Sequence, residues 1–374
     1  MNIVIDGNAF LNVSASIVKN MLQKDKRIGE KYFVNDLLDD SKFMLKQQAA
    51  ATFRNFVINY FSSIVSPFKG SAGAVLFVFD SKSWRKEYIK QFFRDEEDRK
   101  DDQFEYKGNR KYDDKIYLFF ELFQNEILSD LKEMGAVSSR ILGAEGDDLI
   151  AHIVDNFQGD ICIWSVDKDL IQLLESGNRS VILVTPKMMT KNKRVFVAHK
   201  KQEEKPIDIF NFESAVDNSN LDELLREFTQ RDFVKYEVDP AEELMLKILG
   251  GDASDAIPRV HPKMTKSKIE AVIAKLKSNE GDWAVLVHKL RTNDSYVKDM
   301  IVEASAKELK LTTQDSQDQF RKTLDFNIKI ICLSIDHVPA KLSGSIRESF
   351  DFNSIKRFDI NAFKKYHSSK WIHQ

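Results

Sequence analysis

Short apolar runs recur along the first 200 residues, and a polar turn follows each of them. The runs at residues 3–5, 75–79 and 161–166 have the length and the unbroken apolar character of strands buried on both faces of a parallel sheet. Between them, residues 36–63 and 116–134 place apolar side chains at helical spacing. Strand and helix therefore alternate, which predicts an α/β fold with a mostly parallel central sheet flanked by helices.

The pattern changes after residue 200 of this 374-residue chain. Residues 201–238 are polar and charged, and we interpret them as an insertion or linker. It joins a core at residues 1–200 to a mostly helical C-terminal region at residues 239–374. Residues 1–258 carry 35 Lys or Arg against 44 Asp or Glu, whereas residues 259–374 carry 21 against 14. A basic rear segment of this size favours a polyanionic partner.

Composition excludes several classes of protein. Apolar residues make up 43% of the chain, which is enough for a buried core and excludes a wholly disordered protein. Cys162 and Cys332 lie in apolar runs, which predicts buried thiols in a reducing compartment, and no His pairs with them at zinc-site spacing. No segment approaches the roughly 20 apolar residues of a membrane span. We expect a soluble cytoplasmic protein, in the host cytoplasm if its source is a phage.

Carboxylates follow three of the apolar runs directly. Asp6, Asp80 and Asp167 stand just after predicted strands, and the carboxyl ends of parallel strands form the ligand crevice of an open α/β sheet. One such Asp is usually a helix N-cap or a turn residue, but three in the same topological position indicate a site. Six more acids lie in short clusters along the chain: Glu145, Asp147, Asp148, Asp169, Asp252 and Asp255.

Nine converging carboxylates cannot all be ionised without cations beside them. Hard divalent ions are the usual partners of carboxylate oxygens, and two such ions can promote phosphodiester cleavage. We therefore expect two or more Mg²⁺ ions, with Mn²⁺ as a substitute. The dipole of a helix N-terminus is a plainer explanation for part of the cluster at residues 145–148. No Gly-rich Walker loop is present, which disfavours a P-loop NTPase.

Residues 82–115 form a charged segment with 11 basic and 10 acidic side chains. Such a segment is usually a solvated helical excursion. It is too long for a plain connection, however, and long connections in compact domains tend to be functional or disordered.

Six short motifs, in order, give the chain a family resemblance. They are IDGN at 5–8, VFD at 78–80, YKGNR at 106–110, AEGDD at 144–148, SVDKD at 165–169 and GDASD at 251–255. The sequence resembles the metal-dependent 5′-nucleases, which include flap endonucleases, the 5′-nuclease domains of DNA polymerases and phage 5′→3′ exonucleases. Residues 78–86 and 326–352 further resemble the RNase H of T-even bacteriophages. The resemblance implies a PIN-like 5′-nuclease core with a helical arch at about 82–115 and a helical C-terminal domain.

The resemblance also implies a role for each matching residue. The first metal cluster would comprise Asp6, Asp80, Glu145, Asp147 and Asp148. The second would comprise Asp167, Asp169, Asp252 and Asp255. At the base of the arch, Lys107 and Arg110 would touch the scissile phosphate and stabilise its developing charge. Tyr106 would stack on an unpaired base. Without the motif, Lys107 and Arg110 would be read as ordinary solvated surface charges.

Residues 250–273 match the position of a helix–hairpin–helix element that grips the duplex backbone and often a K⁺ ion in this family. Its hairpin is normally Gly-rich, so that backbone N–H groups can approach phosphate. Here the glycines are absent after residue 251, which makes the element degenerate and places ion binding in doubt. Four basic residues remain to hold DNA by charge, or form a plain basic loop: Arg259, Lys263, Lys266 and Lys268.

The family reading predicts a Mg²⁺-dependent, structure-specific 5′→3′ nuclease with flap endonuclease, exonuclease and RNase H activity. Its substrates would be RNA–DNA hybrids and duplex DNA with 5′ ends or flaps, as in the removal of lagging-strand primers in phage DNA replication. We expect a monomer. The aromatic residues of 358–374 would contact a single-strand binding protein or a sliding clamp, or would form a helix packed on the protein itself.

Two other readings stay open. A PIN-type endoribonuclease shares the strand-end acids but lacks the Gly-Asp-x-x-Asp element and the long arch. A catalytically silent module that binds branched DNA and tethers replication partners is the second, although such a protein gains nothing from a repulsive acidic cluster beside phosphate.

Overall fold

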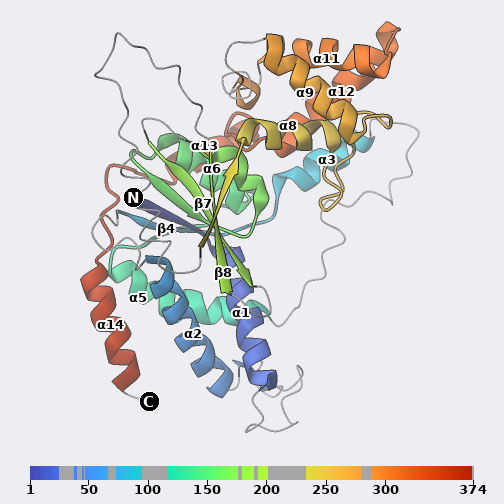
Figure 1. The fold of residues 1–374 in the computed structure, drawn as a ribbon. Helices are drawn as coiled ribbons and strands as arrows, with labels where there is room; N and C mark the ends of the chain where they lie inside the picture. Colours follow the sequence, from blue (N-terminus) through green and yellow to red (C-terminus); the bar gives the residue numbers. More distant parts are fainter. Residues whose placement is uncertain are drawn as a thin grey trace, which may run out of the picture.

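The computed structural model describes residues 1–24, 38–39, 44–45, 47–65, 73–94, 116–175, 179–188, 193–200, 233–279, 283, 289–292 and 294–372. Its described part is built on a central sheet with helices on both faces (Figure 1). Most of the expected arch, residues 95–115, lies outside the described residues, and with it Tyr106, Lys107 and Arg110.

The described part of the chain forms a seven-stranded sheet in the order β5-β4-β1-β6-β7-β8-β9. The strands are β1 Asn2–Asp6, β4 Val75–Val78, β5 Val137–Ser139, β6 Ile161–Trp164, β7 Val181–Met188, β8 Lys193–Lys200 and β9 Phe233–Val238. From β5 to β7 all neighbours are parallel, β8 is antiparallel to β7, and β9 is parallel to β8. The predicted α/β fold with a mostly parallel sheet is confirmed.

Strand β9 revises the expected linker at residues 201–238. Its six residues pair with β8 along their whole length, so this end of the range belongs to the sheet. The strand lies at the edge of the sheet. Edge strands accept charged side chains because one side of the strand stays unpaired, which is why a polar composition did not reveal it.

Alternate residues of the central strands face opposite layers, as the two-residue period of a strand requires. Ile3, Ile5 and Phe77 belong to one apolar cluster, whereas Val4 and Leu76 belong to the other. All five side chains are fully buried. This double burial explains why these strands appear in the sequence as unbroken apolar runs rather than as alternating ones.

One layer of helices covers the face of Ile3 and Ile5. It contains α1 Gly7–Lys24, α2 Gln47–Val65, α4 Ile116–Leu122, the π-helical turn Phe123–Ile127, α5 Leu128–Glu133 and α14 Ile360–Ile372. The helix expected over 36–63 begins at Gln47, after a small ribbon of β2 Leu38–Asp39 and β3 Met44–Leu45. Figure 1 shows α1, α2, α5 and α14 on the same side of the sheet.

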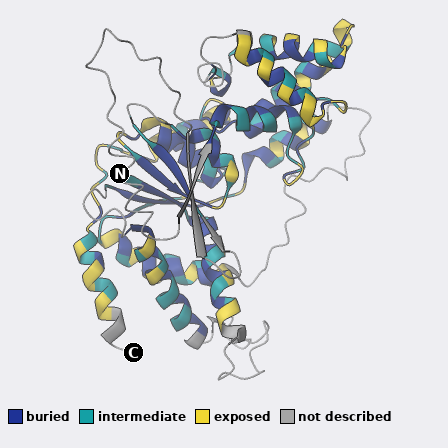
Figure 2. Ribbon diagram, in the orientation of Figure 1, coloured by how far each residue is buried: buried dark blue, intermediate teal, exposed yellow. Residues whose placement is uncertain are grey.

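The other layer of helices covers the face of Val4 and Leu76. They are α3 Trp84–Arg94, α6 Gly146–Asn156, α8 Pro240–Gly250, α9 Lys266–Asn279, α11 Ser295–Leu309, α12 Gln314–Ile331 and α13 Ala340–Glu348. Figure 2 shows that their inward faces are buried and their outer faces exposed. Within the described ranges, no helix combines the length and the apolarity that a membrane crossing requires.

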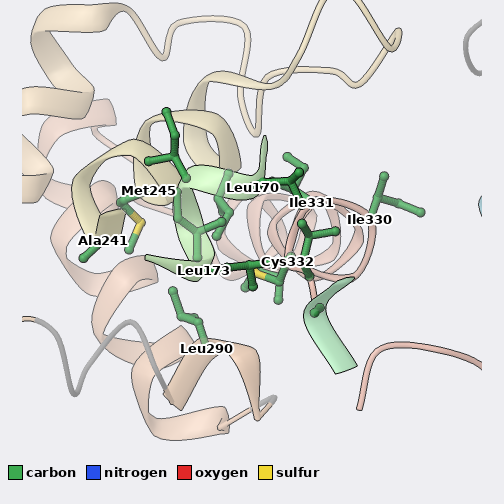
Figure 3. Packing of buried hydrophobic residues seen from close by; sticks show 14 of the residues in the cluster. Leu170, Leu173, Ala241, Met245, Leu290, Ile330, Ile331 and Cys332 are labelled. Atoms are coloured by element: carbon green, nitrogen blue, oxygen red, sulfur yellow. The ribbon is translucent and has the colours of Figure 1, made fainter. Parts of the chain in front are cut away.

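The C-terminal helices share one apolar core with the sheet. Figure 3 shows Leu170 and Leu173, from the short 3-10 helix Lys168–Leu173 (η5), close to Met245 of α8 and to Ile331 and Cys332 at the end of α12. On the same layer, the ring of Phe92 in α3 stacks on Phe326 with centroids 4.2 Å apart. The helical region therefore completes the core around the site instead of forming a separate module.

Helix α14 packs on the protein itself. Phe363 is buried, and its ring lies edge-on to Phe61 of α2 with centroids 5.0 Å apart. Phe358 meets the same Phe61 ring at 5.7 Å. Of the two readings of the C-terminal aromatic residues, internal packing is the one that the geometry favours, because these two rings are already buried.

Both cysteines are buried, as their apolar surroundings predicted. Burial raises the pKa of Cys332 to about 12 and raises that of Cys162 further. Neither thiol therefore ionises near neutral pH, and both act as small apolar side chains.

Candidate functional site

The carboxyl ends of three neighbouring strands bring the predicted acids Asp6, Asp80 and Asp167 to one edge of the sheet. Strand β1 lies between β4 and β6, and Asp6 is its last residue. Asp80 stands two residues beyond β4, and Asp167 three residues beyond β6. Ser165 connects two of these strand ends, because its hydroxyl donates to Asp6 Oδ2 at 2.7 Å and accepts from the Asp167 N–H at 3.0 Å.

The acidity of Asp6 is perturbed by its place at this edge. Burial first, and then the negative charges of Asp80 and Asp167, raise the pKa of its carboxyl to about 6, against hydrogen bonds from the Ala9 N–H and Ser165 that lower it. Two neighbouring carboxylates that disfavour the ionised form of a third leave this edge short of positive charge. A cation bound here would relieve that repulsion.

Asp80 is fixed against the start of helix α6. Its Oδ1 accepts from the Gly146 N–H at 2.6 Å, and a Cβ added at Gly146 would lie 3.1 Å from that oxygen. Asn8 Oδ1 accepts from the Asp80 N–H at 3.0 Å, which ties the ends of β1 and β4 together. The glycine of the AEGDD motif therefore leaves room for the close approach of the carboxylate to the helix end, which a Cβ would crowd.

The sequence analysis did not identify Arg85, which binds two of the predicted ligands. Its guanidinium donates to Glu145 Oε2 at 2.8 Å and to Asp148 Oδ1 at 2.8 Å, and all three side chains are almost fully buried. Asp148 Oδ2 also accepts from the Trp84 indole at 3.1 Å and from the Glu145 N–H at 3.1 Å. Both oxygens of Asp148 are thus engaged within the protein, while they also form half of the capping box of α6.

Arg85 also reaches the C-terminal region. Its Nε donates to the carbonyl of Ile330 at 3.0 Å, in the last turn of α12. Carbonyl groups in the last turn of a helix have no partner within the helix, so an outside donor satisfies one of them. A single buried guanidinium therefore joins the base of α3, the acidic start of α6 and the end of α12. The sequence offers no local signal for this, because the partners are 60 and 245 residues away.

The second group of acids gathers around a lysine that the sequence analysis also missed. Asp167 caps η5, where its Oδ1 accepts from the Asp169 N–H at 2.9 Å. The ammonium of Lys247, on α8, donates to Asp169 Oδ1 and lies 3.0 Å from Asp252 Oδ2. Asp169 and Asp252, which are 83 positions apart in the sequence, are therefore held together by one positive charge.

Asp252 sits in a tight loop that Gly251 makes possible. Gly251 has φ 69° and ψ −178°, and a Cβ there would lie 2.5 Å from the carbonyl oxygen of Ile257. The Asp252 and Ile257 main chains exchange hydrogen bonds of 3.0 and 2.8 Å across the loop. Burial acts to raise the pKa of Asp252, but hydrogen bonds from Ser254 and Lys247 outweigh it, so the pKa lies below its usual value. Asp255 is buried in the same loop.

The expected DNA-binding residues lie in and after this loop, between α8 and α9. Arg259, Lys263 and Lys266 are exposed, and Lys268 is half-buried. The loop is held from behind by Asn327 of α12, whose amide donates to the carbonyls of Ile248 and Pro258 at 2.8 Å each. The cations are thus displayed on an anchored segment, although the hairpin differs from a Gly-rich one.

At both predicted clusters, the described residues suit a divalent ion only in part. Carboxylate oxygens are the right donors at both, and the mutual repulsion at Asp6 calls for a cation. Among the described residues, however, no three acidic, His or Cys side chains converge closely enough to hold a metal ion. Two basic side chains already form ion pairs with four of the predicted ligands. Arg85 pairs with Glu145 and Asp148, and Lys247 pairs with Asp169 and Asp252. Asp147, another predicted ligand, is half-buried on the first turn of α6.

Comparisons with known proteins give weak likenesses. No protein-family model matches the chain, and no curated protein matches it. Among solved structures, a bacteriophage T5 protein co-crystallised with metal ions is similar at a TM-score of 0.44 and 14% identity, over 99% of this chain and 98% of that one. The T5 5′-exonuclease with bound zinc follows at 0.42 and 14%, over 95% and 99%. A T5 flap endonuclease complex with DNA and metal ions gives 0.38 and 15%, over 87% and 98%. Similarity at this level does not assign a function.

Proposed function

We propose that this protein is a divalent-metal-dependent, structure-specific 5′→3′ nuclease that hydrolyses phosphodiesters at 5′ ends or flaps. The observation that carries the proposal is that Asp6, Asp80 and Asp167 stand at the carboxyl ends of three adjacent strands, on one sheet edge beside the acidic start of α6. The six ordered motifs of the sequence support the same conclusion. The preferred metal would be Mg²⁺, and RNase H activity with primer removal in phage DNA replication is the finer form of the proposal.

In this proposal the chain's own residues prepare the site. When bound, divalent ions supply an activated water and stabilise the charge that builds up on the reacting phosphate. Ser165 and the Ala9 N–H hold Asp6 in place, and the Gly146 N–H holds Asp80. The Arg85 guanidinium orients Glu145 by donating to its carboxylate. Lys107 and Arg110 would approach the phosphate, and Tyr106 a base.

Substrate binding is assigned to the basic loop after α8. Arg259, Lys263, Lys266 and Lys268 would contact phosphates of duplex DNA or of an RNA–DNA hybrid, which requires no reading of bases. A free 5′ end and the shape of the backbone would then select the cleavage site. A single-strand binding protein or a sliding clamp stays a proposed partner, although Phe363 of α14 is buried against Phe61.

One observation favours a second candidate, a catalytically silent module that binds branched DNA. Four of the nine predicted ligands are bound by Arg85 or Lys247. A site that is neutralised internally needs no metal to be stable. Such a protein would bind flaps without cutting them.

Cleavage of labelled substrates decides between the two. We expect the wild-type protein to cut a 5′-labelled flap and an RNA–DNA hybrid with Mg²⁺ and to cut neither in EDTA. Asp147→Asn should bind the flap but cut it more than about 100-fold more slowly, the scale of losing one charge-stabilising group in an active site. Glu133→Gln, an exposed change on α5 at the opposite face of the sheet, should cut like the wild type. Binding without cutting by every protein would favour the silent module.

A further inference from the structure

Lys247 occupies the place between two acids of the second cluster. Its ammonium donates to Asp169 and Asp252, which come from η5 and from the loop after α8. The other oxygen of Asp252, Oδ1, is already bound by the Ser254 N–H at 2.9 Å and hydroxyl at 2.6 Å. Asp169 Oδ1 and Asp252 Oδ2 are therefore the oxygens that face each other across the Lys247 ammonium. A metal ion that bridged these two oxygens would occupy the position of the ammonium.

Lys247 differs from the other resident cation in how firmly it is held. The Arg85 side chain is 3% exposed and makes several bonds to Glu145, Asp148 and Ile330. The Lys247 side chain is 28% exposed and is a compact charge on a flexible stem. A guanidinium enclosed in this way cannot leave, whereas an ammonium at the edge of a cluster can swing away.

We propose that Lys247 is an internal counter-ion of the second acidic cluster, which closes the Asp169–Asp252 pair and competes with a divalent cation for it. A divalent ion enters this pair only when the ammonium withdraws. The inference rests on the proposed function only in taking these acids as metal ligands, and it assigns Lys247 the positioning role of setting metal occupancy.

The chain contains a matched control for this role. Lys277 of α9 bridges two carboxylates in the same way, at 3.0 Å from Asp239 Oδ2 and 2.7 Å from Glu242 Oε2, with its side chain 36% exposed. Those acids lie at the start of α8, where Asp239 directly follows strand β9, and neither of them is a predicted metal ligand. Removing the charge of Lys277 breaks a similar ion pair but opens no predicted metal site.

The test is direct Mn²⁺ binding by calorimetry on the DNA-free full chain. We expect Lys247→Met to bind Mn²⁺ about tenfold more tightly than the wild type, or to bind an additional ion. A positive charge beside a carboxylate changes the pKa of that carboxylate by about one unit or more, and one unit corresponds to a tenfold change in the affinity for a cation. Lys247→Arg, which keeps the charge, should not gain affinity, and Lys277→Met should match the wild type. Equal Mn²⁺ binding by Lys247→Met and wild type would overturn the inference.

A second measurement uses the unaltered protein, so that it does not depend on the folding of a variant. Acetylation of surface lysines, read by mass spectrometry, should increase at Lys247 when Mn²⁺ is added and stay constant at Lys277. Unchanged reactivity of Lys247 at saturating Mn²⁺ would count against the inference. Both readouts are independent of cleavage. If the protein cuts no substrate but Lys247 and Lys277 differ as described, the proposed function is wrong and the inferred role of Lys247 still holds.

Discussion

At the scale of single residues, the site depends on buried charges that are neutralised by partners far away in the sequence. Arg85 and Asp148 are both nearly inaccessible to water, and each would be costly to bury alone. Their bidentate contact, together with the Trp84 indole and the Ile330 carbonyl, offsets that cost. The start of α6, with its acidic residues, is therefore fixed by a cation that does not belong to its motif.

Replacing Arg85 tests this dependence. Arg85→Met should lower the free energy of unfolding by about 3–5 kcal/mol, because the buried carboxylates of Glu145 and Asp148 would lose the guanidinium that both of them bind. Arg54→Met is the matched control, since Arg54 makes a similar two-bond contact with Glu126 in which the side chains are 35% and 49% exposed. Its loss should cost no more than about 1 kcal/mol.

Urea unfolding of the wild type and the two variants provides the comparison. Similar losses of unfolding free energy for Arg85→Met and Arg54→Met would show that the burial of the Arg85 ion pairs does not increase their contribution to stability.

At the scale of elements, the loop between α8 and α9 joins the second acidic cluster to the basic surface. Asp252 and Asp255 lie at its start, and the exposed cations Arg259 and Lys263 follow. Asn327 of α12 fixes the loop to α8, because its amide donates to the Pro258 carbonyl in the loop and to the Ile248 carbonyl in α8. Without the expected glycines of a hairpin, the loop thus gains its shape from one glycine and one buried amide.

That single glycine, Gly251, should be irreplaceable. Its φ of 69° with ψ of −178° is a region that only glycine occupies readily, and a Cβ would meet main-chain atoms at 2.5 Å. We expect Gly251→Ala to cost more than about 3 kcal/mol of stability, above the strain of a left-handed residue alone.

Gly159→Ala is the control for backbone strain without a clash. Gly159 also has a positive φ, 80°, but a Cβ there would meet no atom within 4 Å. Its substitution should cost only about 1–2 kcal/mol. Thermal unfolding of both variants measures the difference, and equal losses would mean that the predicted clash in the loop after α8 is relieved without cost.

At the scale of the whole molecule, charge and core are distributed differently. Charge divides the chain into an acidic front and a basic rear, as residues 1–258 and 259–374 carry opposite net charges. The apolar core does not follow that division, since η5, α8 and α12 share one cluster. Gln172 joins the two parts as well, because it exchanges hydrogen bonds with the Ile331 carbonyl and the Leu333 N–H at 3.1 and 2.8 Å.

The proposed use of the basic loop predicts a salt effect. The double variant Lys263→Gln/Lys266→Gln should bind a flap more weakly, and the slope of log affinity against log salt should fall by about 2, since each phosphate contact contributes roughly 0.9. Stability should be unchanged, because both side chains are exposed. Lys364→Gln/Lys365→Gln, on α14 at the other face of the sheet, removes the same charge as a control.

Binding isotherms at several salt concentrations distinguish the outcomes. Equal slopes for the two double variants would place the DNA-contacting surface elsewhere on the molecule.

The sequence by itself determined the α/β alternation, the buried central strands and the strand-end positions of Asp6, Asp80 and Asp167. These features follow from local patterns, because a doubly buried strand must be apolar and its polar successor marks its end. The glycines beside Asp80 and Asp252 were visible as parts of motifs, although the contacts that require them were not.

Only the tertiary structure decided which cations neutralise the acids. Arg85 and Lys247 appear in the sequence as ordinary charges on amphipathic helices. The chain must fold before they meet Glu145, Asp148 and Asp169, which are 60 to 78 positions away, whereas Asp252 is only five positions from Lys247. The edge strand β9 was likewise beyond the pattern, and so was α2 as the helix on which α14 packs, although packing of α14 on the protein itself was one of the two predictions. Pairing between distant segments depends on which faces the core brings together, and periodicity along the chain carries no information about that.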